Sequence, residues 1–163
     1  MDPDRFRYSA ENCSIRRTLD IVGERWTLLV LREAFYGVRR FADFHRALGC
    51  AKNLLSARLK TLVEEGILER ERYRDPGARA RDEYRLTEKG LELFSRARRP
   101  DAMGRRYAAD SAGPPVELAH SGCGATVGVE LRCSAGHRPL SAHDTAAIPG
   151  PGAKPAAEPT HVA

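Results

Sequence analysis

Two His–Cys pairs stand in the last third of this 163-residue chain, at the spacing His120-x2-Cys123-x9-Cys133-x3-His137. Imidazole nitrogen and thiolate sulfur are ligands that tetrahedral zinc prefers, and short spacings within each pair are typical of such sites. The connecting stretch ATVGVEL, residues 125–131, has the composition of a strand. We therefore expect a small C-terminal β-hairpin that either holds zinc or is free of metal, and no other cofactor.

A second set of candidate residues lies in AKNLLSARLKTLVEE, residues 51–65, which has the period of an amphipathic helix. At about 100° per residue, its apolar side collects Ala51, Leu54, Leu55, Leu59, Leu62 and Val63. Its polar side collects Asn53, Ser56, Ala57 and Lys60, with Lys52 at the flank and Glu64 and Glu65 at the far end.

The polar side of this helix carries residue types that suit DNA. Asn53 can bond an adenine edge in two places, and Ser56 can bond several bases. Ala57 is small enough to admit a thymine methyl group, and Lys60 suits a phosphate or a guanine. A plain amphipathic surface helix is the alternative interpretation.

A basic hairpin is predicted directly after this helix. Gly66 ends the helix, and ILERERYRD and DEYRLTE are strand-like around a bend at Pro76 and Gly77. In this wing, residues 68–86, the arginines that we expect to contact the DNA backbone or minor groove are Arg72, Arg74, Arg79 and Arg81. In the alternative, hairpin arginines, including Arg70 and Arg85, pair only with Glu71, Asp75, Asp82 and Glu83.

The distribution of charge agrees with an anionic partner. The formal net charge is +5, from 27 basic and 22 acidic residues. Residues 1–99 hold 22 basic and 16 acidic groups, whereas residues 100–163 hold 5 basic and 6 acidic groups. The positive excess therefore lies entirely in the first part of the chain, where the helix and hairpin are.

The elements that must position these residues are predicted within residues 13–99, in the order helix, helix, helix, helix, strand, strand, helix. WTLLVLREAF is apolar nearly all round, which indicates a central buried helix. RFADFHRAL predicts a short helix, which Gly49 links tightly to helix 51–65. This order predicts a mainly α fold with a β-hairpin wing, the winged helix-turn-helix.

The remaining segments bound the domain. Residues 1–12 are predicted to be a flexible N-terminus, residues 100–145 an extension, and the proline-rich residues 146–163 a disordered tail. A membrane span and a signal peptide are both absent from the sequence pattern, so we expect a cytoplasmic protein with reduced cysteines. Phosphate-binding loops, nucleophile elbows and metalloprotease motifs are also absent, so we do not expect an enzyme.

Three stretches within about residues 12–95 carry a family resemblance: CSIRRTLDIVGERWTLLVLREAFYGVRRFADFHRAL, AKNLLSARLKTLVEEGILERERY and EYRLTEKGLEL. They resemble the HxlR-type winged helix-turn-helix regulators, which are bacterial and archaeal transcription factors. The resemblance implies a homodimer on a pseudo-palindromic operator, with helix 51–65 in the major groove. It also implies a dimer contact between the N-terminal helix and the helix after the wing, with recognition helices about 34 Å apart.

The chain departs from this family at three positions. Cys50 stands where these proteins usually carry an aliphatic residue, so we expect a small buried hydrophobe. Pro100 interrupts a last helix that usually continues, because proline breaks or kinks helices. Similar proteins carry His-x2-Cys-Gly followed by Cys-x2-Cys-Gly, whereas Gly136 leaves His137 as the last ligand here.

Cys13 matches a cysteine that thiol-based members of this family use to sense oxidants or electrophiles. It stands near a helix N-terminus with Arg16 and Arg17 one turn on, and both features favour a thiolate. A redox-sensing or electrophile-sensing regulator is therefore one alternative function, and a buried packing cysteine is the alternative role for Cys13. A protein-interaction module on the same fold is a further alternative.

Overall fold

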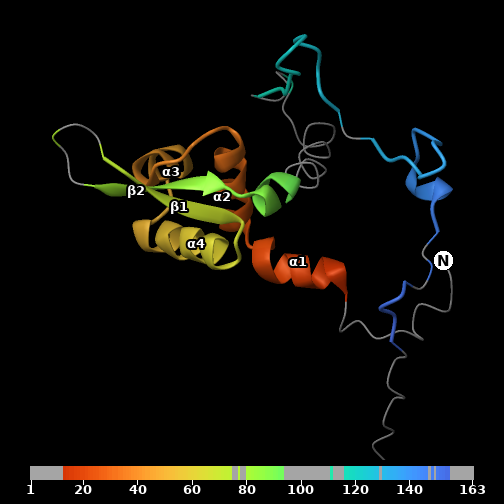
Figure 1. Ribbon diagram of the computed structural model, residues 1–163, viewed down its shortest axis with the longest axis horizontal. Helices are drawn as coiled ribbons and strands as arrows, with labels where there is room; N and C mark the ends of the chain where they lie inside the picture. Colours follow the sequence, from red (N-terminus) through yellow and green to blue (C-terminus); the bar gives the residue numbers. More distant parts are fainter. Residues whose placement is uncertain are drawn as a thin grey trace, which may run out of the picture. The chain divides into compact units, whose positions relative to one another are not determined.

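The computed structural model describes residues 13–74, 77, 80–93, 111, 116–128, 130–146, 148 and 150–154. The elements within residues 13–93 follow in the predicted order: α1 (Ser14–Val22), α2 (Arg25–Phe35), α3 (Phe41–Leu48), α4 (Lys52–Glu64), β1 (Leu68–Tyr73), β2 (Arg81–Leu86) and a helical segment at 88–93 (Figure 1). A short 3-10 helix that was not predicted, η2 (Ala142–Asp144), lies in the C-terminal segment. Two compact units are present, residues 21–129 and residues 1–20 with 130–163. Arg79, Pro100 and residues 1–12 lie outside the described residues.

Helix α2 forms the centre of the winged-helix unit, because α3, α4 and β2 all pack against it. Its Thr27, Val30, Leu31 and Ala34 side chains are buried, as the continuous apolar sequence predicts. The buried hydrophobic core comprises Val22, Val30, Leu31, Ala34, Phe44, Cys50, Leu55, Leu59, Leu62, Ile67 and Leu68. Each fully buried leucine in this set contributes about 1.5–3 kcal/mol to folding.

The link between α3 and α4 is short because Gly49 takes a left-handed conformation, with φ of 62°. Its N–H bonds to the carbonyl of His45 at 3.0 Å and so closes α3. Cys50 follows and is 6% exposed, which confirms the predicted buried hydrophobe. The prediction that Ala51 lies on the buried face is wrong, because Ala51 is the extended residue before the first turn of α4 and is exposed.

Strands β1 and β2 form the predicted antiparallel hairpin, with Leu68 opposite Leu86 and Arg72 opposite Asp82. Leu68 is buried at the core end of the hairpin. The backbone before α3 adds a single bridge to the free edge of β2, between Arg40 and Glu83. This bridge fixes the hairpin relative to the helix-turn-helix.

The helical segment at 88–93 is tied to the end of α4. The hydroxyl of Thr87 donates to the carbonyl of Gly66 at 2.7 Å and accepts the N–H of Gly90 at 3.1 Å. The Lys89 ammonium donates to the carbonyl of Glu65 at 2.5 Å. The start of this helix is therefore held by the backbone that ends the predicted recognition helix.

The C-terminal segment differs from its predicted strand. Ala119 and Thr126 form an isolated antiparallel bridge, and His120 N–H bonds to the carbonyl of Ala125 at 2.8 Å. The chain thus turns back within residues 118–127, so the described residues of 125–131 do not form a strand between the two His–Cys pairs. Among the described helices, none is long and apolar enough to cross a membrane.

Substituting Gly90 with alanine should lower the free energy of unfolding by about 1–3 kcal/mol. A Cβ there would overlap the carbonyl oxygen of Ile67 and lie 3.0 Å from Cδ2 of Leu86. Urea denaturation followed by circular dichroism measures the change. Gly128→Ala is the control, since a Cβ at Gly128 meets nothing within 4 Å, and equal stability of the two variants would contradict this account.

Candidate nucleic-acid interface

Helix α4 presents two faces that differ sharply in exposure. On the inward face three leucines have 0% exposed surface, Leu55, Leu59 and Leu62. On the outward side the predicted contact residues are all exposed, Lys52, Asn53, Ser56, Ala57 and Lys60. Because the leucines are fixed in the core, the rotation of the helix about its axis is fixed, and with it the direction of the outward residues.

Asn53 has a structural contact at the start of α4. Its Oδ1 accepts the N–H of Leu54 at 2.9 Å, while the N-cap residue Ala51 offers no side-chain cap. Asn53 therefore takes part of the capping role that a polar N-cap residue usually has. Its amide nitrogen is the group suited to donate to adenine N7, guanine N7 or guanine O6.

Lys60 forms an exposed i,i+4 ion pair with Glu64, at 3.6 Å between Nζ and Oε1. Such pairs contribute only about 0.3–0.5 kcal/mol. A DNA phosphate can therefore replace Glu64 as the partner of Lys60 at little cost.

One face of the hairpin places a carboxylate between two arginines. Asp82 lies 3.5 Å from the guanidinium of Arg70 and 3.9 Å from that of Arg72. Next to Asp82 on this face, Tyr84 packs edge-on against Phe44 with ring centroids 6.4 Å apart. Burial raises the pKa of the Tyr84 phenol above its usual value, and the contact of its ring with Phe44 anchors the hairpin on the core.

The other face of the hairpin holds a network of charged side chains. Arg85 contacts Glu83 at 2.6 Å and Glu71 at 2.8 Å. The hydrogen bond to Glu83, whose side chain is 11% exposed, is the main cause that raises the pKa of Arg85. We therefore assign Arg85 a structural role.

Arg40 is a further cation beside the wing. Its guanidinium carbon lies over the ring of Tyr73, 4.4 Å from the ring centroid. The sequence analysis did not predict this contact, although the Arg39–Arg40 doublet indicates a local positive charge.

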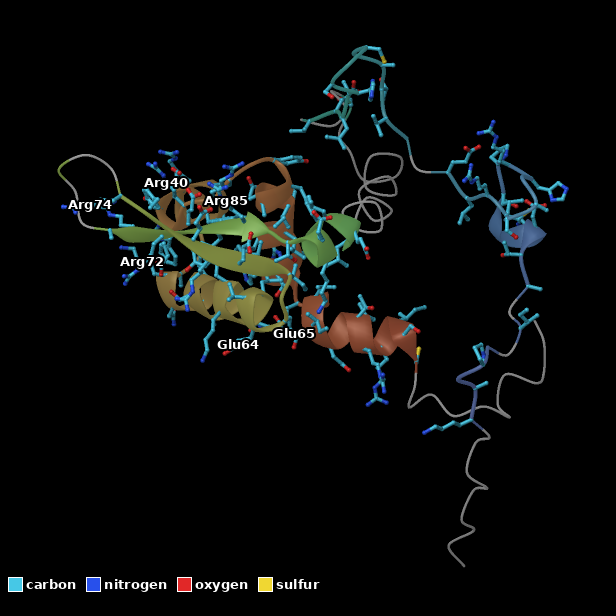
Figure 2. The ribbon with its side chains drawn as sticks, viewed as in Figure 1. Arg40, Glu64, Glu65, Arg72, Arg74 and Arg85 are labelled. Carbon is cyan, nitrogen blue, oxygen red and sulfur yellow. The ribbon has the colours of Figure 1, made fainter. Side chains whose placement is uncertain are left out.

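The remaining predicted wing contacts that the structure describes, Arg74 and Arg81, are exposed. Figure 2 shows Arg72 and Arg74 near the tip of the hairpin, with Glu64 and Glu65 at the opposite end of α4 and the sheet. The basic side chains of the wing are therefore separated from this acidic pair.

The predicted sensor Cys13 is half-buried and directly precedes α1. Its carbonyl oxygen accepts the N–H of Arg17 at 3.0 Å, so it stands at the start of the first turn. Arg16 and Arg17 are both exposed.

Each predicted ligand pair of the C-terminal segment is brought together locally. His120 Nδ1 lies 3.2 Å from Cys123 Sγ, and His137 Nδ1 lies 3.1 Å from Cys133 Sγ. No group of three or more His, Cys, Asp or Glu side chains that could hold a metal ion occurs in the part of the chain that the structure describes.

A helix-turn-helix with an outward polar face, followed by an arginine-rich antiparallel hairpin, defines a winged helix-turn-helix protein that binds DNA. Residues 21–111 match the HxlR-like helix-turn-helix family. The chain is also 44% identical over 145 residues to the HTH-type transcriptional regulator Rv3095 of Mycobacterium tuberculosis, covering 88% of this chain and 90% of that one. The chain belongs to the HxlR-like helix-turn-helix family of transcriptional regulators, and it is not an enzyme.

Solved structures share this fold. The crystal structure of PA1607, assigned as a transcription factor, is similar with a TM-score of 0.75 and 35% identity, over 85% of this chain and 95% of that one. The oxidised form of the redox regulator HypR is similar with a TM-score of 0.54 and 27% identity, over 60% of this chain and all of that one.

Asp82→Asn should bind DNA about 1.5–5-fold more tightly than the native chain, because it removes a competitor of phosphate worth about 0.2–1 kcal/mol. Fluorescence anisotropy with labelled duplex DNA at constant salt measures the change. Glu88→Gln makes the same change of charge beyond the other end of β2, at an exposed position. If both variants gain affinity equally, the effect is one of net charge and the local account is wrong.

Proposed function

We propose that the chain acts as a homodimeric regulator on a pseudo-palindromic operator, with α4 in the major groove and the wing on the backbone or minor groove. One observation carries the proposal: three leucines of α4 with 0% exposure hold the opposite, polar face of the helix in solvent. The major groove is wide enough to admit an α-helix. DNA as the partner implies action in the cytoplasm.

The roles of the side chains follow from their chemistry. Asn53, Ser56 and Ala57 are the groups that we propose to contact base edges, and Lys52 and Lys60 to contact phosphates. In the wing, the proposed backbone or minor-groove contacts are Arg72, Arg74, Arg79 and Arg81.

Exposed apolar side chains support a homodimer. On α1, Ile15 is 72% exposed and Leu19 is 56% exposed. On the helical segment after the wing, Leu91 is also exposed. Large apolar side chains on two helices that the family resemblance assigns to the dimer contact are most simply explained by a second copy that covers them.

A thiol-based switch is a second candidate function, and the likeness to the redox regulator HypR favours it. Cys13 would be the reacting thiol, since it stands at the first turn of α1 near Arg16 and Arg17. Loss of DNA affinity on mild oxidation, absent in Cys13→Ser, would support this function, and equal affinity of the two forms would reject it.

The DNA-binding proposal predicts distinct effects for two classes of variant. Lys60→Ala and Arg72→Ala should each weaken binding to the DNA that lies upstream of the gene for this protein. Each should also reduce the magnitude of the slope of log affinity against log salt concentration by about 1, because one phosphate contact is lost. Asn53→Ala should instead change sequence preference, by about 1–3 kcal/mol at one base pair. Anisotropy titrations at several salt concentrations measure both effects.

Lys154→Ala is the matched control for the loss of one positive charge, because Lys154 is exposed and lies outside the winged-helix unit. Its salt slope should equal that of the native chain. Unchanged affinity in all three interface variants, or one affinity for every DNA sequence, would reject the proposal.

The homodimer proposal predicts a mass of twice 18.0 kDa by light scattering at micromolar concentration. Leu19→Glu should shift the population toward the monomer, because it places a charge in an apolar contact. Arg17→Ala, an exposed position on the same helix, should leave the mass unchanged. A native chain that is monomeric at every accessible concentration would contradict the proposal.

A further inference from the structure

Tyr73, the last residue of β1, stands beside arginines from two other segments of the chain. The guanidinium carbon of Arg40, which precedes α3, lies 4.4 Å from the centroid of the Tyr73 ring. Arg81 is the direct partner of Tyr73 across the hairpin. Side chains of directly opposed residues share one face of a sheet, with Cβ atoms about 4.5–5.5 Å apart. Arg40 and Arg81 are therefore brought together at one aromatic side chain.

Backbone contacts fix the position of Arg40 relative to the hairpin. The N–H of Tyr84 donates to the carbonyl of Arg39 at 2.8 Å, and Arg40 forms an antiparallel bridge with Glu83. These contacts hold residues 39–40 along the free edge of β2. Because they involve main-chain atoms only, the side chain of Arg40 can be replaced without removing them.

Two glutamates on the same face of the hairpin are engaged by another arginine. Glu71 and Glu83 share the face of Tyr73, because side chains two residues apart in a strand point the same way. Both contact Arg85, at 2.8 Å and 2.6 Å. Arg85 therefore offsets the charge of these glutamates, which leaves less negative charge to oppose the arginines beside Tyr73.

A guanidinium held over an aromatic ring is suited to bind a phosphate. Its N–H groups lie in the plane of the guanidinium, so stacking leaves its edge available to an anion while its position is restricted. Where an exposed arginine already has a carboxylate partner, a phosphate can replace that partner at little cost, because exposed ion pairs contribute little.

The position of Arg40 along the hairpin agrees with a contact to DNA. Tyr73 directly precedes Arg74, and Figure 2 shows Arg40 nearer to the tip of the hairpin than Arg85. Arg72 is the neighbour of Tyr73 in β1 and so lies on the opposite face. This end of the wing therefore presents arginines on both of its faces.

We propose that Arg40, held over Tyr73 and beside Arg81, binds a phosphodiester group of the DNA backbone, and that this phosphate differs from the one that Arg72 contacts. The inference rests on the proposed function, because it adds a phosphate contact to the same DNA complex. Arg40 is the contacting residue. Tyr73 is a positioning residue that restricts the guanidinium of Arg40.

Anisotropy titrations at several salt concentrations separate the two roles, with the shortest fragment of the upstream DNA that the native chain binds. Arg40→Gln should bind about 3–10-fold more weakly and reduce the magnitude of the salt slope by about 1, because one phosphate contact is lost. Tyr73→Leu should bind about 2–5-fold more weakly with an unchanged slope, because the charge of Arg40 remains. Lys154→Ala should match the native chain in both quantities.

Replacement of single phosphates identifies the partner of Arg40. The same fragment is prepared as a series in which one phosphate at a time is an uncharged methylphosphonate. At the phosphate bound by Arg40, the replacement should weaken binding of the native chain by about 3–10-fold and leave binding of Arg40→Gln unchanged. Tyr73→Leu should show a reduced response at that position, and Arg72→Ala should lose its response at a different one.

The outcomes separate this inference from the proposed function. If Lys60→Ala and Arg72→Ala weaken binding while Arg40→Gln binds like the native chain, the Arg40 contact is wrong and the proposed function stands. If Arg40→Gln loses affinity but keeps every methylphosphonate response of the native chain, Arg40 acts on the structure alone and the inference is again wrong. A native chain that binds no DNA would reject both.

Thermal unfolding provides the check on the fold. Both variants should unfold at the native temperature, because the side chains of Arg40 and Tyr73 lie outside the buried core. If Arg40→Gln is unstable, the methylphosphonate series with Tyr73→Leu decides the matter. A response reduced at one position would then support the contact, and the native response at every position would overturn it.

Discussion

The packing of α4 against α2 is the interaction on which the rest of the interface depends. Leu55, Leu59 and Leu62 have no exposed surface, and truncating any of them to alanine typically costs about 2–5 kcal/mol. With 3.6 residues per turn, fixing these three side chains also fixes which residues point outward. Fold stability and the proposed base contacts therefore depend mostly on different residues of a single helix, and Asn53, which also caps the first turn, belongs to both sets.

The electrostatics of the wing are more balanced than its arginine content indicates. Asp82 lies within 4 Å of two arginines, and Arg85 contacts two glutamates. The positive electrostatic potential of the wing is thus weaker than its number of arginines alone would produce. In compensation, the ion pairs with Asp82 restrict the side chains of Arg70 and Arg72, so less side-chain entropy would be lost if a phosphate took the place of the carboxylate, as the proposed wing contact requires.

Local patterns in the sequence were sufficient to predict the order of the elements, the winged fold and the two faces of α4. Glycines marked the turns, and the apolar period marked the buried stripe, because both signals are properties of a few consecutive residues. The capping contact of Asn53, the stacking of Arg40 on Tyr73 and the bridge from Arg40 to Glu83 were not predicted. The last two depend on segments some thirty or more residues apart, which no local period encodes.

The C-terminal segment shows the same division between local and non-local signals. Ligand spacing predicted that each histidine lies near its cysteine, and the structure brings both pairs together. The strand predicted over residues 125–131 is absent from the described residues of that range. Instead, Thr126 forms an isolated antiparallel bridge with Ala119, which precedes it in the chain. The direction in which a short segment pairs depends on its turn, here at Gly124, and composition alone does not reveal it.

The buried thiol of Cys50 can be used to measure local unfolding of the domain. Its side chain belongs to the buried core and stands in the link between α3 and α4, so a reagent can reach the thiol only when this part of the core opens. Where reclosing is faster than the reaction, the rate of modification is proportional to the equilibrium fraction of opened molecules. The chain therefore carries a natural reporter of local unfolding between α3 and α4, and slower modification in the presence of a ligand would measure the stability that the ligand confers on this part of the domain.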